Sequence, residues 1–379
     1  FHLWLCQALN RVILFLFVLC IVMYAFKKIL NEISIEIEKA ESFMNTQVTS
    51  CYDLDDSTNC LPIAEKLIPP PDSIFFHETS CRKGLNSRQA CSIESAARLH
   101  PHRNIYVFFN APISKAKLVA GCLSTLLRYK NINLARLHNS KYAKGTALDD
   151  LLTNNENAWS LFPVAHTADM LRFVTMYKYG GVYLDTDMLI VKPLDALGKN
   201  WAARQDPSTV NTAAMAISQH GVGHDLVTSV IEDVSINYRS DEWSYNGPEA
   251  LTRSLENICN TLDVLLMSSN TCRGFEVYNS KTFYPFYYDN TTFFFTKSTG
   301  FWNVSTDIDS KIYGYHLWNQ VTGSIKVQMD SPYEKLARKY CPLIRERFGD
   351  KFGADTELWS IDSEALSPYI SYQHSSERL

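Results

Sequence analysis

The longest apolar run in the chain lies near its start. Residues 12–26 (VILFLFVLCIVMYAF) are apolar without interruption, with a basic residue before them and two after them. A bilayer span needs about 17–25 such residues, and basic side chains at its ends can reach the lipid headgroups. The pattern predicts a single transmembrane helix at 12–28, after a short cytoplasmic segment at 1–11. The alternative is a signal-peptide core, but no small-residue cleavage site follows.

After this helix the pattern changes twice. Residues 29–71 are polar and acidic and end in three prolines, which is typical of a stem. Apolar strands and segments of helical period then alternate through residues 72–342, with strands at 73–80, 104–110, 132–136 and 182–184 and helices at 91–100, 118–129, 165–179 and 226–238. Such alternation predicts an α/β domain, with a parallel sheet covered by helices on both faces. Residues 343–379 form a charged C-terminal extension for which no structure is predicted.

Composition and cysteines narrow the class of protein. Hydrophobic residues make up 46% of the chain, enough for a large core, and the net charge of −4 argues against nucleic acid as a partner. Three pairs of cysteines are close in sequence, namely Cys51/Cys60, Cys81/Cys91 and Cys259/Cys272. None has the spacing of a C-x-x-C metal site, so we expect disulfides in an oxidising compartment. Glycosylation acceptors at Asn290 and Asn303 also favour a luminal body behind a signal anchor.

The strongest chemical signal is the stretch 179–187 (YGGVYLDTD). Two glycines and a short apolar strand lead to Asp185 and Asp187. On an extended chain, side chains two residues apart share a face, so the two carboxylates are predicted to lie together at a strand end. Carboxylates suit Mg²⁺ or Mn²⁺ and leave positions open for phosphate oxygens. The stretch therefore predicts an enzyme that uses a nucleotide-activated group.

Further blocks of sequence follow the order found in one enzyme family. They are ETS at 78–80, CSIESAAR at 91–98, ADMLR at 168–172, DTD at 185–187, NGPEALTR at 246–253, FYP at 283–285, HLWN at 316–319 and YCP at 340–342. In these blocks the chain resembles the DXD-containing glycosyltransferases, the sugar-binding-region family that includes lactosylceramide 4-α-galactosyltransferase and α-1,4-N-acetylglucosaminyltransferase. It is most similar to the α-1,4-galactosyltransferase branch. The resemblance implies a GT-A (Rossmann-like) fold with a mixed, mainly parallel sheet.

The resemblance also implies a metal site. Asp185 and Asp187 would hold Mn²⁺, or Mg²⁺, on the diphosphate of a UDP-sugar donor, and His316 is the candidate for a third ligand. Imidazole suits Mn²⁺ beside carboxylates. The alternative for His316 is a hydrogen-bonded core histidine.

Other residues of the matching blocks are predicted to contact the donor. Asp169 and Arg172 lie three apart on one helix face and would look toward the sugar and the diphosphate, with an intrahelical ion pair as the alternative. Phe76, Glu78 and Thr79, at the end of the first strand, would line the uridine pocket.

The same resemblance implies that the reaction retains the α configuration. Retaining glycosidases use a carboxylate nucleophile, and Glu249 is the catalytic candidate here. Close relatives often carry Gln at this place, which favours a same-face substitution assisted by the leaving phosphate. Glu249 is equally suited to the N-terminus of a helix, where its charge complements the helix dipole.

Together these observations predict a type II Golgi membrane hexosyltransferase with a luminal catalytic domain. It would move an α-hexose, galactose first, from a UDP-sugar to a galactose-type acceptor on a glycolipid through an α-1,4 linkage. Transfer of N-acetylhexosamine to a glycolipid or an O-glycan is the alternative.

Two other classes of protein fit the sequence less well. Haloacid-dehalogenase-type phosphatases carry Thr or Val where this chain has Leu189, and no downstream lysine and acidic pair matches theirs. A non-catalytic, membrane-tethered sugar-binding protein has no use for the intact pair of aspartates.

Overall fold

The computed structural model describes residues 23–24, 26–28, 51–52, 54–153, 160–297 and 310–353. The chain divides into a unit of residues 1–47 and a unit of residues 48–379, and the elements below belong to the second. Within the described residues, no helix combines the length and the apolar character that a membrane crossing requires. The predicted transmembrane helix at 12–28 lies mostly outside those residues and stays a prediction.

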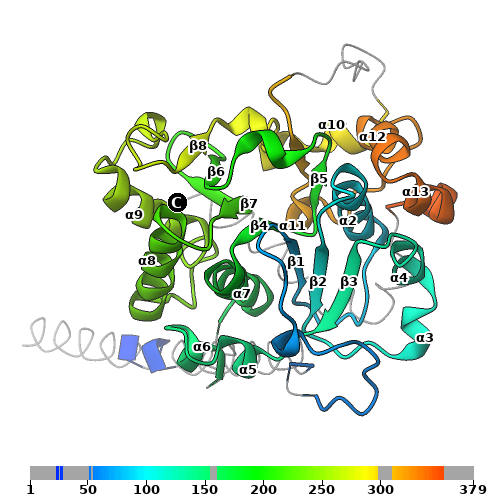
Figure 1. Ribbon diagram of the computed structural model, residues 1–379, viewed down its shortest axis with the longest axis horizontal. Helices are drawn as coiled ribbons and strands as arrows, with labels where there is room; N and C mark the ends of the chain where they lie inside the picture. Colours follow the sequence, from blue (N-terminus) through cyan, green and yellow to red (C-terminus); the bar gives the residue numbers. More distant parts are fainter. Residues whose placement is uncertain are drawn as a thin grey trace, which may run out of the picture. The chain divides into compact units, whose positions relative to one another are not determined.

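A seven-stranded sheet forms the centre of the larger unit (Figure 1). Its order is β3 (Ile132–Arg136), β2 (Ile105–Phe109), β1 (Ile74–Glu78), β4 (Gly181–Leu184), β7 (Val210–Ile217), β6 (Trp201–Arg204) and β8 (Glu276–Tyr278). Only the two pairings made by β7 are antiparallel, and the others are parallel. The predicted mixed, mainly parallel sheet is therefore confirmed. A separate pair, β5 (Met188–Ile190) and β9 (Gly314–His316), is antiparallel.

Two hydrophobic cores cover the two faces of the sheet, because successive strand residues point to opposite sides. On β1, Ile74 and Phe76 belong to one core and Phe75 to the other. The first core includes residues of α2 (Ser87–Leu99), α12 (Pro332–Tyr340) and α13 (Pro342–Phe348), and the second includes residues of α7 (Pro163–Tyr179), α8 (Val222–Asn237) and α9 (Pro248–Cys259). Figure 1 shows these two groups of helices on either side of the strands.

Short helices fill the connections. The α-helices are α3 (Lys115–Leu118), α4 (Gly121–Leu126), α5 (Asn139–Ala143), α6 (Asp149–Thr153), α10 (Thr292–Phe295) and α11 (Asn319–Thr322). The 3₁₀ helices are η1 (Ala64–Lys66), η3 (Leu194–Leu197), η4 (Val264–Leu266), η5 (Ser280–Thr282), η6 (Tyr288–Asn290) and η7 (Gly349–Lys351). The helix predicted at 118–129 is thus two short helices, with Gly121 at a positive φ of 55° where the second begins.

The disulfides differ from the pairs suggested by sequence spacing. The described residues contain Cys51–Cys81, Cys91–Cys341 and Cys259–Cys272. Of the three pairs that are close in sequence, only Cys259 and Cys272 are bonded to each other, and Cys60 is exposed and outside these bonds. Spacing failed because the fold packs α12 and α13 against α2, which brings Cys341 to Cys91. Cys51–Cys81 attaches a segment that precedes the predicted domain limit of 72, and Cys91–Cys341 attaches the chain close to the limit of 342.

Candidate active site

The two glycines before the Asp-Thr-Asp motif make a sharp reversal between α7 and β4. Gly180 has a φ of +62° and Gly181 a φ of +90°, which side chains disfavour. A Cβ on Gly180 would lie 2.8 Å from the carbonyl oxygen of Ile217, and one on Gly181 would lie 2.4 Å from that of Ser73. The glycine pair is therefore required both by the turn and by the close packing of the strand.

Asp185 and Asp187 lie in a tight turn that joins β4 to β5. The amide of Met188 donates to the carbonyl of Asp185 at 2.9 Å, and the amide of Asp185 donates to the carbonyl of Ala213 at 2.8 Å. The predicted reason for their convergence, alternation along an extended strand, is wrong. The turn itself brings the two carboxylates together.

His316 reaches this turn through the pairing of β9 with β5. Met188 is its register partner, and the amide of Leu317 donates to the carbonyl of Asp187 at 3.0 Å. The Nε2 atom of His316 lies 3.2 Å from Oδ1 of Asp187. Ligand atoms of Asp185, Asp187 and His316 all lie within 4.8 Å of one another. The structure thus brings together the three residues that the sequence suggested as metal ligands.

Asp187 is held as a charged group. Burial raises its pKa, but His316 and the backbone amide of Asn319, which donates to Oδ2 at 2.8 Å, outweigh burial and leave the pKa below its ordinary value. Trp318 packs edge-on against His316 with ring centroids 4.2 Å apart, and Tyr284 packs edge-on from 5.6 Å. These two aromatic side chains fix the imidazole beside the carboxylate.

Arg172 links α7 to the Asp-Thr-Asp turn. Its guanidinium lies 3.1 Å from Oδ1 of Asp169 and 3.1 Å from Oδ1 of Asp185. The intrahelical ion pair therefore exists, and the same side chain also contacts a predicted metal ligand. Burial raises the pKa of Asp169 to about 7, although Arg172 opposes the shift. A Cβ on Gly247 would lie 2.4 Å from the Asp169 carboxylate, so the turn before α9 also packs against this cluster.

The end of β1 lies next to the turn that holds Asp185 and Asp187. Oε1 of Glu78 accepts hydrogen bonds from the amide and hydroxyl of Ser80 at 3.1 and 2.5 Å, and burial raises the Glu78 pKa to about 7. Gln89, at the start of α2, is a hydrogen-bond neighbour of Glu78 and donates to the hydroxyl of Thr186 at 3.3 Å. This bridge connects the β1 end to the middle residue of the motif.

Three other predicted residues have contacts that leave their roles open. The Thr79 hydroxyl donates to the carbonyl of Val164, and Phe76 is fully buried in a hydrophobic core. Glu249 lies in the first turn of α9 and accepts a hydrogen bond from the hydroxyl of Ser244. Nucleotide binding by Thr79 and Phe76, and a catalytic role of Glu249, stay predictions.

Sequence reasoning missed several residues that support the site. The Tyr183 hydroxyl donates to Oδ1 of Asp185 at 2.7 Å, Thr212 accepts a hydrogen bond from Arg172, and Asn319 supplies the amide already described. Tyr183 lies inside the motif, and its spacing of two from Asp185 was the available signal. Asn319 lies in the HLWN block that follows His316, although no role was predicted for it. For Thr212 no local signal exists, because only the fold brings its strand to the turn.

Parts of the chain are similar to known glycosyltransferases. A family model described as "Glycosyltransferase sugar-binding region containing DXD motif" matches residues 86–205, and one described as "Alpha 1,4-glycosyltransferase conserved region" matches residues 219–348. Human lactosylceramide 4-alpha-galactosyltransferase is 28% identical over 73% of this chain and 78% of its own length. Human alpha-1,4-N-acetylglucosaminyltransferase is 25% identical over 73% and 81%.

A solved structure of the galactosyltransferase LgtC, in complex with donor and acceptor sugar analogues, aligns with a TM-score of 0.40 and 15% identity, over 72% of this chain and 95% of that one. The two matched ranges lie on either side of β7 in the sequence. The first contains Asp185 and Asp187, and the second contains His316. The chain belongs to the family of DXD-containing glycosyltransferases that carry an alpha 1,4-glycosyltransferase conserved region.

Proposed function

We propose that this protein is a metal- and UDP-sugar-dependent hexosyltransferase. It transfers an α-hexose, galactose first, to a terminal galactose-type acceptor on a glycolipid and forms an α-1,4 linkage. The observation that carries the proposal is the convergence of Asp185, Asp187 and His316, with ligand atoms within 4.8 Å. The 28% identity to human lactosylceramide 4-alpha-galactosyltransferase supports the choice of sugar and acceptor.

The residues of the cluster fit a divalent cation. Two carboxylates and one imidazole are a donor set that suits Mn²⁺. The Nδ1 atom of His316 is buried and has no hydrogen-bond partner among the described residues, whereas a structural core histidine would satisfy both nitrogens. A bound cation would offset the negative charge that grows on the departing diphosphate.

The chain's own groups keep the site ready for this charge. Arg172 and Tyr183 both contact Oδ1 of Asp185, and the Asn319 amide and His316 contact opposite oxygens of Asp187. These contacts orient the two carboxylates before any ligand arrives. Preorganised groups of this kind need no rearrangement while charge develops.

Retention is assigned to a same-face substitution. The bond between the anomeric carbon and the phosphate oxygen breaks, the acceptor oxygen bonds to that carbon, and the acceptor's proton passes to the departing phosphate. Two contacts support this route over a covalent one. Glu249 is engaged by Ser244, and Asp169 is paired with Arg172.

A second candidate is transfer of N-acetylhexosamine to a glycolipid or an O-glycan. The similarity to human alpha-1,4-N-acetylglucosaminyltransferase favours it. For either donor we assign a single-pass type II topology in the Golgi membrane with a luminal body. Three disulfides and the exposed Asn290 in a glycosylation acceptor support an oxidising compartment.

A donor screen tests the function. The purified protein is given lactosylceramide and UDP-galactose, UDP-N-acetylgalactosamine or UDP-N-acetylglucosamine, with Mn²⁺ or with EDTA. We expect glycolipid product with one donor, and a loss of about 100-fold or more with EDTA or in Asp187→Ala. Asp150→Ala, at an exposed position on α6, is the control. Full activity of Asp187→Ala in EDTA would overturn the mechanism, and sugar binding without release of UDP would indicate a non-catalytic protein.

A further inference from the structure

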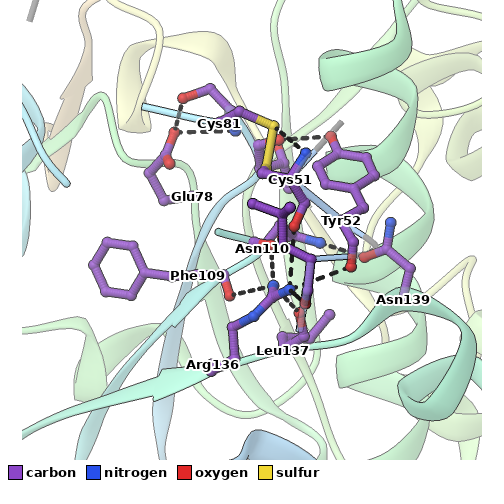
Figure 2. The surroundings of a disulfide bond; sticks show 12 residues. Cys51, Tyr52, Glu78, Cys81, Phe109, Asn110, Arg136, Leu137 and Asn139 are labelled. Atoms are coloured by element: carbon purple, nitrogen blue, oxygen red, sulfur yellow. Dashed lines mark hydrogen bonds between the residues drawn. A yellow bond between two sulfur atoms is a disulfide. The ribbon is translucent and has the colours of Figure 1, made fainter. Parts of the chain in front are cut away.

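Residues ahead of the predicted catalytic domain pack onto the edge of the sheet where the donor would bind. In open α/β sheets, ligands bind beyond the carboxyl ends of the parallel strands. Those ends are Glu78 of β1, Phe109 of β2 and Arg136 of β3. Residues 51–52 and 54, predicted as part of a stem, contact Thr79 just after β1, Ala111 just after β2 and Arg136 of β3 (Figure 2).

Two contacts attach this segment to the loop after β1. Cys51 forms a disulfide with Cys81, which follows Glu78, Thr79 and Ser80 directly. The Tyr52 hydroxyl donates to the carbonyl of Thr79 at 2.6 Å, and Tyr52 is buried. Thr167 of α7 is a further hydrogen-bond neighbour of this hydroxyl. The loop is therefore fixed on its outer side by a covalent bond and a buried hydrogen bond.

A buried arginine fixes the segment in turn. Arg136 is fully buried, and its NH2 group donates to the carbonyls of Cys51 and Tyr52, each at 3.2 Å. Its NH1 group donates to the carbonyls of Asn110 and Leu137 at the ends of β2 and β3. A buried guanidinium is costly unless its donors are satisfied, so these carbonyls specify one position for the segment. Figure 2 shows Arg136 beneath the disulfide with these bonds converging on it.

The loop that is fixed in this way lies beside the turn that holds Asp185 and Asp187. Gln89 contacts Glu78 on one side and the hydroxyl of Thr186, between the two aspartates, on the other. A shift of the loop would therefore move the wall of the donor site. It would leave the ligands Asp185, Asp187 and His316 in place, because their own contacts come from other elements.

We propose that Cys51 and Tyr52 are positioning residues of the nucleotide site, held by Arg136, and that they set the affinity for the uridine diphosphate part of the donor. This inference rests on the proposed function, since it assigns the β1 end to the nucleotide. The minimal catalytic unit then begins before residue 51, and a protein cut at residue 72 binds donor poorly.

The test is titration of uridine diphosphate into the purified protein in the presence of Mn²⁺. In Tyr52→Phe, which loses the buried hydroxyl and its hydrogen bonds to the Thr79 carbonyl and to Thr167, we expect the Kd to rise about 3- to 10-fold. A larger rise is expected in Cys51→Ser/Cys81→Ser. In both variants we expect the Kd for Mn²⁺ of the nucleotide-free protein and the kcat to stay within about twofold of the parent. KM for the donor rises, because the lost contact serves nucleotide binding.

Cys259→Ser/Cys272→Ser is the matched control, because it also removes one disulfide, next to β8. A merely structural role of Cys51–Cys81 would lower the active fraction in both disulfide variants and leave the Kd unchanged. An unchanged Kd in Tyr52→Phe and in Cys51→Ser/Cys81→Ser overturns this inference while the proposed function stands. A parent protein that binds no uridine diphosphate overturns both.

Discussion

The turn that holds Asp185 and Asp187 and the end of β1 lie side by side but are built in opposite ways. Two of the three candidate metal ligands stand in one short stretch, Asp185–Asp187, and the antiparallel strand β9 supplies the third. The β1 end depends on segments that are far apart in the sequence, namely residues 51–52, 78–81 and 136. A local motif therefore announces the first region, and only packing assembles the second.

Two buried carboxylates show what this difference does to chemistry. Burial alone raises the pKa of a carboxyl group. At Asp187 the imidazole of His316 and a backbone amide overcome burial, and the pKa falls. At Glu78 the hydrogen bonds from Ser80 do not overcome it, and the pKa rises to about 7. The Asp187 carboxyl is thus set to stay ionised for a cation, and the Glu78 carboxyl titrates near neutral pH.

The largest expected effect separates metal binding from nucleotide binding. His316→Ala removes an imidazole that lies 3.2 Å from Asp187, so we expect the Kd for Mn²⁺ to rise at least about tenfold. Calorimetry on the nucleotide-free protein measures it, with the exposed His220→Ala as control. Tyr52→Phe should leave this Kd unchanged. If the two variants weakened Mn²⁺ equally, the division into two regions would be wrong.

A medium effect is expected on the pH dependence of stability, through Glu78 at the end of β1. The pKa of Glu78 rises from 4.5 to about 7 on folding, so between these values the folded state binds more protons than the unfolded state. The free energy of unfolding therefore falls as pH rises through this window and is level above it. The fall is a few kcal/mol at most, since one pKa unit is about 1.4 kcal/mol.

Glu78→Gln should make that dependence shallower by the part that Glu78 contributes, while Asp169, whose pKa is also raised to about 7, keeps its own part. The measurement is the free energy of unfolding of the metal-free protein by urea at pH 5 and pH 8. The exposed Glu346→Gln serves as control and should keep the parent's dependence. Parallel curves for the parent and Glu78→Gln would show that the Glu78 carboxyl does not titrate in this window.

The smallest effect is expected on removal of the hydrogen bond that orients the Asp185 carboxylate. Tyr183→Phe removes a 2.7 Å hydrogen bond to Asp185, but Arg172 still contacts the same oxygen at 3.1 Å. We expect a loss of about three- to tenfold in donor turnover at saturating Mn²⁺. Tyr278→Phe, which removes a hydrogen bond to the Leu197 carbonyl, should have no effect. A loss as large as that of Asp187→Ala would show that Tyr183 does more than orient a carboxylate.

Much of the fold was predictable because its signals are local. Alternating apolar stretches and helical periods gave the parallel part of the sheet and both helix layers, and the glycine pair with two aspartates gave the core of the site. The helix predicted at 118–129 is split near Gly121, a local signal that its apolar pattern does not show. The pairing of Cys91 with Cys341 was not predictable, because it follows from packing between segments that residue patterns along one segment do not record.

The sequence by itself determined the family, the two aspartates that are candidate metal ligands and the position of the sharp turn before them, because a motif, a residue type and a steric requirement are carried by neighbouring residues. Only the tertiary structure decided that His316 joins these aspartates, that Arg172 bridges to one of them, and that residues 51–52 close over the end of β1. These contacts join groups that are distant along the chain. They exist because strand pairing and the burial of Arg136 fix where each segment lies.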